Sequence, residues 1–140
     1  MLPTSTKIYL DVDGTLIHEE LERYNQPAAH LKEFLEHLEP YPVYWLTTHC
    51  MDGDPNHVRR HLSKLLPHDI FQYVLRYEPT SWTENKTEAI DFTSDFVWFD
   101  NDVMSEEREE LARHGAENNL VEVNLVDNPE YLGKIIERMF

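Results

Sequence analysis

Cysteine, basic residues and long apolar runs are all scarce in this sequence, and each shortage excludes a class of protein. The single cysteine, Cys50, cannot form a disulfide within the chain. No apolar run approaches the roughly 18 residues that a membrane-spanning helix needs, and the short polar start of the chain is unlike a secretory leader. We therefore expect a cytoplasmic protein with no membrane-inserted segment.

The shortage of basic residues leaves the chain strongly acidic. Its 12 Lys and Arg residues stand against 27 Asp and Glu residues, which gives a formal net charge of −15. Such a charge repels nucleic-acid backbones and anionic lipids, so broad nucleic-acid binding is not expected. A single phosphate group in a pocket is compatible with it, because bound cations and backbone N–H groups can dominate the local field.

The 140 residues, 41% of them apolar, suffice for one globular domain over residues 1–140. Short β-rich apolar runs alternate with segments of helical spacing. The predicted strands cover residues 8–10, 43–46, 71–75, 96–99 and 120–126. One helix is predicted with Pro27 in its first turn and Leu31, Phe34, Leu35 and Leu38 as its apolar stripe. Others are predicted after Asp54-Pro55, from Ser105 to Gly115, and after Asn128-Pro129. Another, opened by Ser81 or Thr83, is predicted to carry Lys86.

Alternating strands and helices favour parallel pairing, because parallel neighbours need crossover connections, which are almost always right-handed. The predicted fold class is therefore α/β, a Rossmann-like, doubly wound parallel sheet of about five strands. Ligands bind at the carboxyl ends of the strands in such sheets. Candidate functional residues are therefore those that directly follow each strand.

Two carboxylates, Asp11 and Asp13, follow the first predicted strand, and Gly14 eases the turn after them. In extended backbone the two side chains point to the same side, so both can address one bound group. A carboxylate beside a metal is a competent nucleophile toward phosphorus, and a second one can protonate the leaving oxygen and then activate water. The pair suits two-step phosphoryl transfer, with Asp11 as nucleophile and Asp13 as general acid and base.

Further polar residues follow the other predicted strands. Thr47 and Thr48 come after the second strand and offer hydroxyl and N–H donors to a phosphoryl oxygen, with Thr47 the favoured contact. Asp100-Asn101-Asp102, after the fourth strand, offers the oxygen ligands that Mg²⁺ prefers. Lys86, ten residues before that strand, can neutralise the nucleophile and the transferring phosphoryl group. We therefore expect Mg²⁺ as cofactor and a phosphorylated substrate.

In order and content these residues resemble the motifs of the haloacid dehalogenase superfamily. The matching segments are Asp11-Val12-Asp13-Gly14-Thr15-Leu16, Leu46-Thr47, Lys86 and Phe99-Asp100-Asn101-Asp102, and they span residues 8 to about 126. The resemblance implies an aspartyl-phosphate on Asp11, with Mg²⁺ held by Asp11, the Val12 carbonyl and Asp100, and with Asp13 nearby. Asn101 separates the two acids of the last motif, which leaves open whether Asn101 or Asp102 supports the metal. Asp102 would act through a water or by orienting a ligand.

The gaps between these motifs leave no room for a large cap domain. In this superfamily that implies an open site with a macromolecular or terminal phosphate substrate, or a cap supplied by another subunit of an oligomer. Trp45-Leu46-Thr47-Thr48 and Trp98-Phe99-Asp100 are similar to capless members found with RNA repair proteins. Arg59 and Arg60 follow the second motif and can reach a distal substrate phosphate, although a solvated helix face is their commoner use.

Three other functions compete with a phosphohydrolase. The main alternative is a catalytically weak phosphate-binding or interaction module on the same fold. A receiver-type signalling domain is disfavoured, because its phosphorylated Asp should follow the third strand, where Arg76-Tyr77-Glu78 stand. A zinc site from His49, Cys50, His57 and His61 is the third, although two histidines four residues apart are more often surface residues.

Overall fold

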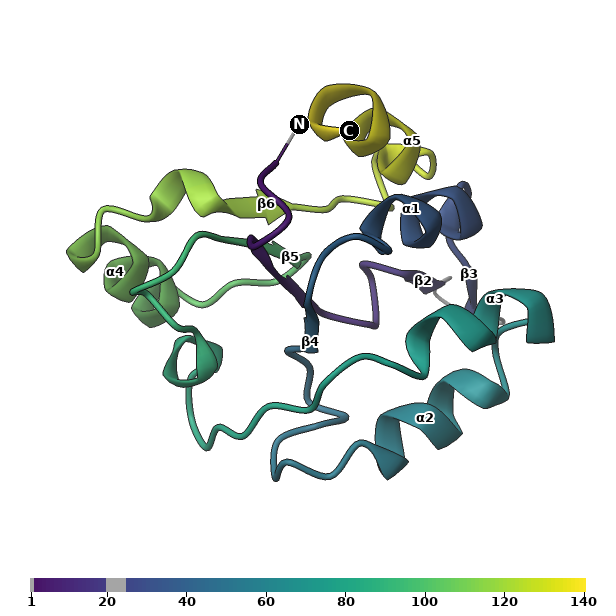
Figure 1. The fold of residues 1–140 in the computed structure, drawn as a ribbon, viewed down its shortest axis with the longest axis horizontal. Helices are drawn as coiled ribbons and strands as arrows, with labels where there is room; N and C mark the ends of the chain where they lie inside the picture. The colour runs from purple at the N-terminus through teal and green to yellow at the C-terminus, as the bar shows by residue number, and fades with distance from the viewer. Residues whose placement is uncertain (1, 20–24) are drawn as a thin grey trace.

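The computed structural model of the protein describes residues 2–19 and 25–140 (Figure 1). At its centre is a sheet of four parallel strands in the order β4-β1-β5-β6. The strands are β1 (Lys7–Leu10), β4 (Val43–Trp45), β5 (Phe96–Asp100) and β6 (Leu120–Glu122). These are four of the five predicted strands, the last of them shorter than predicted, and the predicted α/β class with a parallel sheet is confirmed.

Alternation along the strands divides the core between the two faces of the sheet. β1 places Ile8 and Leu10 in one apolar cluster and Tyr9 in another. β5 alternates in the same way, with Val97 in the first cluster and Trp98 in the second. Both faces of the sheet are therefore buried, as a parallel sheet requires.

Helices cover both faces of this sheet (Figure 1). The first cluster is covered by α1 (Leu31–Leu38) and α5 (Tyr131–Met139), which pack together, and takes residues from α2 (Asn56–Ser63) and α3 (His68–Val74). α4 (Ser105–Arg113) covers the second cluster, and the 3-10 helices η1 (Lys86–Ala89) and η2 (Glu117–Asn119) lie beside it. The arrangement is Rossmann-like. None of the helices in the described ranges combines the length and the apolar character that crossing a membrane requires.

The prediction of a strand over residues 71–75 is wrong, because this segment belongs to α3. Ile70, Phe71 and Val74 lie on one face of that helix and pack on the first cluster, with Val74 fully buried. Pro67 precedes the helix, where its missing N–H removes no hydrogen bond. A short apolar run fits a buried strand and a buried helix equally well, so its composition alone misled the prediction.

A small antiparallel pair, β2 (Ile17–Glu19) and β3 (Asn25–Pro27), was not predicted. Pro27 pairs with Ile17 at the end of β3, and α1 begins only at Leu31, so the prediction of Pro27 in the first helical turn is wrong. Within residues 2–19 and 25–140, the connections between the sheet strands contain this pair and the helices named above and no further domain.

The register of the sheet places the candidate residues together. Leu10 of β1 pairs with Phe99 of β5 on one side and with Trp45 of β4 on the other. The next residue, Asp11, therefore lies beside Asp100, and its N–H donates to the Phe99 carbonyl at 3.0 Å. β4 precedes β5 in the chain but lies on the opposite side of β1, so the sheet has its topological switch point here, where α/β proteins bind ligands.

Candidate active site

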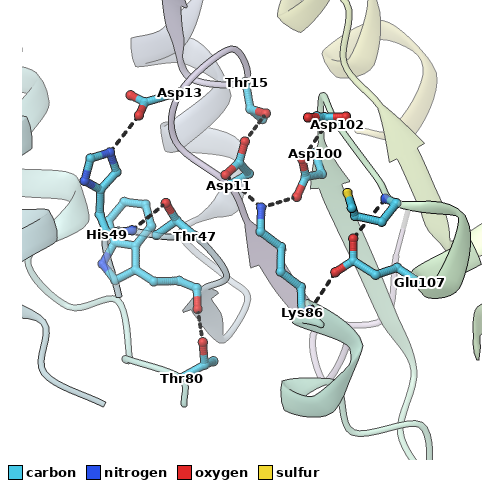
Figure 2. Close-up of polar contacts among 12 residues, drawn as sticks. Asp11, Asp13, Thr15, Thr47, His49, Thr80, Lys86, Asp100, Asp102 and Glu107 are labelled. Atoms are coloured by element: carbon cyan, nitrogen blue, oxygen red, sulfur yellow. Dashed lines mark hydrogen bonds and ion pairs between the residues drawn. The ribbon is translucent and has the colours of Figure 1, made fainter. Parts of the chain in front are cut away.

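A buried lysine bridges two buried carboxylates at the carboxyl edge of the sheet (Figure 2). The Lys86 Nζ lies 3.1 Å from Asp11 Oδ1 and 2.7 Å from Asp100 Oδ2. Asp11 directly follows β1, Asp100 ends β5, and Lys86 begins η1. Three residues predicted from separate segments of the sequence thus form one cluster of two carboxyl groups and one lysine.

The charges in this cluster shift one another's pKa values. Burial and the neighbouring Asp100 carboxylate raise the pKa of Asp11 to about 7, although Lys86 acts in the opposite direction. Burial by itself would lower the pKa of Lys86, but the charges of Asp11 and Asp100 outweigh it and raise that pKa above its ordinary value. Lys86 therefore stays charged at neutral pH, whereas Asp11 is divided between its two protonation states.

The turn after β1 fixes the orientation of Asp11. The Thr15 hydroxyl donates to Asp11 Oδ2 at 3.1 Å, and the Val12 carbonyl accepts the N–H groups of Thr15, Leu16 and Ile17 at 3.1, 2.9 and 3.2 Å. This carbonyl is fully used inside the turn, so the geometry gives no support to its predicted role as a metal ligand.

Gly14 allows the turn to approach the loop after β5. It adopts φ +80°, a left-handed conformation that suits glycine, and a Cβ atom there would collide with the Asn101 side chain. The contact presses the Asp11 turn against the Asp100 loop. This close approach places the two acidic segments side by side.

Asp13 points away from the lysine cluster toward two histidines. Its Oδ2 lies 2.6 Å from His49 Nε2 and its Oδ1 lies 3.1 Å from His61 Nε2. Burial alone would raise the pKa of Asp13, but the hydrogen bonds with His49 and His61 outweigh it and hold the pKa below the ordinary value. Asp13 is therefore ionised at neutral pH.

The two threonines after β4 have different surroundings. Thr47 is buried, and its Oγ1 accepts the His49 N–H at 3.3 Å. Thr48 is exposed and lines the cavity above the lysine cluster. Thr48 therefore lines the cavity, and the favoured Thr47 does not.

Neither of the predicted arginines lies at this cavity. Arg59 on α2 donates from Nη2 to the Leu75 carbonyl at 3.1 Å, which directs its guanidinium toward the end of α3. Arg60 is exposed on the same helix. The proposed contact between these residues and a distal phosphate receives no support from their positions, and the surface interpretation fits both.

The cavity above the cluster has a volume of about 530 Å³. Asp11, Asp13, Lys86 and Asp100 line it together with Trp82 and further residues from the loops after β4 and β5. A neighbouring hollow of about 730 Å³ shares Glu19 and Asn101 with it and extends past Gly14 to residues 122–126. Both are open to solvent, which agrees with the absence of a covering domain among the described residues.

Asp102 and Glu107 form hydrogen bonds with Asp100 and Lys86, respectively. The Asp102 N–H donates to Asp100 Oδ1 at 3.0 Å, while the Asp102 side chain is exposed at the cavity rim. Glu107 is buried and accepts the Lys86 N–H at 2.6 Å and the Met104 N–H at 3.0 Å. Sequence reasoning missed Glu107, and the one signal available was its position in the first turn of the predicted helix from Ser105.

The predicted zinc cluster forms only in part. His49 and His61 come together, but Cys50 is buried with its Sγ 3.7 Å from the Thr80 carbonyl. His57 is exposed, and its ring centroid lies 5.2 Å from that of His49. The Asp13 carboxylate contacts the Nε2 atoms of both histidines.

Comparisons of this chain with protein-family models, with curated proteins and with solved structures find no match.

Proposed function

We propose that this protein is a Mg²⁺-dependent phosphohydrolase that acts on phosphate monoesters through an aspartyl-phosphate on Asp11. The observation that carries the proposal is the contact of one lysine with Asp11 and Asp100 at the switch point of a parallel sheet. The motif resemblance to the haloacid dehalogenase superfamily, which rests on the same residues, supports it.

In this mechanism the Asp11 carboxylate attacks phosphorus and the bond to the leaving oxygen breaks. Asp13 gives its proton to the leaving oxygen, so the products are an acyl phosphate on Asp11, an alcohol and the Asp13 carboxylate. A water molecule then attacks the phosphorus, Asp13 takes its proton, and inorganic phosphate leaves as the Asp11 carboxylate is restored. Lys86 balances negative charge on the transferring group throughout both steps. Thr48 donates a hydrogen bond to a phosphoryl oxygen from the cavity wall.

The cluster fits a hard divalent cation. Lys86 contacts one oxygen of each carboxylate. The second oxygen of Asp11, Oδ2, accepts from the Thr15 hydroxyl, and the second oxygen of Asp100, Oδ1, accepts from the Asp102 N–H. Each of these two oxygens keeps a lone pair for a further ligand. The two carboxylates carry one more charge than Lys86 neutralises, and oxygen-only donors are the ones that Mg²⁺ prefers. When bound, Mg²⁺ would supply neutralisation and orientation of the phosphoryl oxygens.

The shape of the site indicates a substrate that presents a terminal phosphate. A solvent-open cavity of about 530 Å³, beside a second hollow of about 730 Å³, can take a phosphate at its base while the rest of the substrate stays outside. The net charge of −15 works against long polyanions at a distance. We therefore propose a phosphorylated small molecule or chain end as the substrate class.

One observation favours the alternative, a catalytically weak phosphate-binding module. The histidine contacts that hold the Asp13 pKa below its ordinary value leave little protonated Asp13 at neutral pH. Protonation of a poor leaving group would then be slow, whereas activated esters need no such help. The ratio of rates for aryl and alkyl phosphates separates the two functions, because the weak module turns over only the activated ester.

The direct test is hydrolysis of an aryl phosphate with and without Mg²⁺ by the wild type and by Asp11→Asn. We expect Mg²⁺-dependent turnover and an acid-stable, hydroxylamine-sensitive phosphoenzyme in the wild type, and neither in the variant. Asp95→Asn, which changes an exposed carboxylate remote from the cavity, is the matched control. Equal turnover by wild type and Asp11→Asn would contradict the mechanism.

A further inference from the structure

Asp13, His49 and His61 form a second cluster of ligand atoms that the lysine cluster does not use. Asp13 comes from the turn after β1, His49 from the loop after β4, and His61 from the middle of α2. One ligand atom from each residue can be chosen so that all of them lie within 4.8 Å of one another. Figure 2 shows His49 directed at Asp13, on the other side of Asp13 from the contacts that Lys86 makes.

The geometry of this cluster is close to that of a metal centre. His49 Nε2 lies 2.6 Å from Asp13 Oδ2, and His61 Nε2 lies 3.1 Å from Asp13 Oδ1. Ligand distances of about 2.0 to 2.2 Å around tetrahedral Zn²⁺ place neighbouring ligand atoms roughly 3.3 to 3.6 Å apart. To bind one cation, the ligand atoms of the three residues therefore need to move only several tenths of an ångström farther apart than they are here.

The two imidazole rings are stacked with centroids 4.0 Å apart and planes inclined by 18°. Parallel rings direct their Nε2 lone pairs side by side, so one ring must tilt for both to meet a single ion. His61 is held by α2, whereas His49 lies in the loop between β4 and α2, where such a tilt disturbs no regular element. Both side chains are about one fifth exposed, at 17% and 24%, so a metal ion can reach them.

The donor set separates this cluster from the proposed Mg²⁺ site. Asp11 and Asp100 offer only carboxylate oxygens, which suit Mg²⁺, whereas two imidazoles and one carboxylate suit Zn²⁺, Co²⁺ and related transition metals. The strong negative charge of the molecule raises the local concentration of any divalent cation. The two candidate metal sites thus differ in chemistry, and they lie next to each other because Asp11 belongs to one and Asp13 to the other.

We propose that Asp13, His49 and His61 form a transition-metal site of the Zn²⁺ class, with water completing the coordination, separate from the Asp11–Asp100 site. The site binds its metal whether or not the protein is a phosphohydrolase. If the proposed function holds, metal in this site occupies the carboxylate that must accept the proton from water. Zn²⁺ is then an inhibitor of a reaction that Mg²⁺ supports.

Co²⁺ binding tests the site without reference to activity, because tetrahedral Co²⁺ absorbs visible light and Zn²⁺ displaces it without absorbing. We expect wild-type protein to bind one Co²⁺ with a tetrahedral spectrum that Zn²⁺ abolishes. Loss of one direct ligand should cost at least as much as the 10- to 100-fold that loss of a supporting residue costs. His61→Ala and His49→Ala should therefore each weaken binding by about 100-fold or more.

Two further variants keep the result interpretable. His57→Ala removes the exposed histidine one helical turn before His61, and it should change Co²⁺ affinity by less than about threefold. Asp100→Asn, checked for folding by circular dichroism, should leave the Co²⁺ spectrum unchanged. Absence of a tetrahedral spectrum in the wild type, or equal losses in His57→Ala and His61→Ala, would overturn the assignment.

The inhibition arm is measured separately. At fixed Mg²⁺, added Zn²⁺ should lower aryl phosphate turnover of the wild type, and the inhibition, normalised to each protein's own rate without Zn²⁺, should be about 100-fold weaker in His61→Ala. Zn²⁺ inhibition that is equal in the two proteins contradicts the functional link, because it places the inhibitory ion elsewhere. Failure of the proposed phosphohydrolase activity leaves the Co²⁺ spectrum as an independent result.

Discussion

At the scale of single residues, Asp11 has the most unusual environment in the proposed mechanism. Its pKa is raised from 3.8 to about 7 by burial and by Asp100. Below about pH 4 this carboxyl is protonated in both the folded and the unfolded chain. Between pH 4 and 7 only the unfolded chain ionises, so the free energy of unfolding falls as the pH rises through this interval and changes no further above it.

Asp11→Asn should remove this loss of stability. In metal-free buffer we expect the variant to be more stable than the wild type at pH 8, by up to about 4 kcal/mol from the size of the shift, and equally stable at pH 4. Urea unfolding at both values measures the difference. Asp95→Asn, at an exposed position, should retain the wild-type dependence, and a pH-independent gain in Asp11→Asn would show that ionisation of Asp11 is not the cause.

Asp100 and Asp102 differ in burial, and this predicts different effects on metal binding. Asp100 is fully buried and contacts Lys86, whereas the Asp102 side chain is exposed and only its N–H supports Asp100. Asp100→Ala should nearly eliminate turnover and severely weaken Mg²⁺ binding, and Asp102→Ala should cost 10- to 100-fold at most. Mg²⁺ titration of activity compares the two, and greater damage from Asp102→Ala would assign the ligand to the other aspartate.

Residue types and spacing predicted part of this site. Asp11 and Asp100 follow strands whose apolar runs are evident, and parallel pairing brings the carboxyl ends of neighbouring strands together. The pairing of Asp13 with His61 was not predictable, because it joins residues 48 positions apart through the packing of α2. The hydrogen bonds that the Val12 carbonyl accepts within the turn were not predictable either, because they depend on dihedral angles that composition does not specify.

At the scale of elements, Glu107 joins α4 to η1. Its carboxylate accepts the Lys86 N–H and the Met104 N–H, so one side chain begins α4 and positions the lysine. Glu107→Gln presents an N–H₂ group to one of these donors and leaves that donor unsatisfied, a loss of about 1–3 kcal/mol for a buried group. We expect lower stability in urea unfolding and a reduced kcat, because Lys86 shifts.

Glu106→Gln is the matched control for this prediction. Glu106 also lies in the first turn of α4, but its side chain is exposed. It should change stability by no more than about 0.5 kcal/mol, the ordinary range for surface substitutions. Equal effects of the two variants would mean that the charge at the helix start, and not the contact with Lys86, explains the loss.

Secondary-structure elements were predicted best where apolar residues repeat at a regular spacing over a longer stretch of sequence. The buried stripe of α1 was predicted, because Leu31, Phe34, Leu35 and Leu38 repeat at helical spacing and all are buried, but the helix start was placed too early, at Pro27. α3 and the β2–β3 pair are too short to carry a clear period. Their conformations depend on contacts with the first cluster and with each other, which a local pattern does not contain.

At the scale of the whole molecule, the net charge of −15 predicts how salt acts on stability. Mutual repulsion of like charges destabilises the compact state, and raising the ionic strength from about 0.01 M to about 0.15 M shortens the Debye length from about 30 to about 8 Å. The Tm should therefore rise over this range, in sodium chloride and in choline chloride alike. A fall would mean that surface ion pairs such as Lys7–Asp91 dominate.

The positions of the three tryptophans give the molecule an optical reporter. Trp45 and Trp98 are fully buried in the core, whereas Trp82 is 8% exposed and lines the cavity above Lys86 and Asp100. A ligand that enters the cavity changes the solvent around one indole and leaves the other two unaltered. Intrinsic fluorescence can therefore follow phosphate binding in unlabelled protein, and Trp82→Phe should abolish the signal while the emission of the buried core persists as an internal reference.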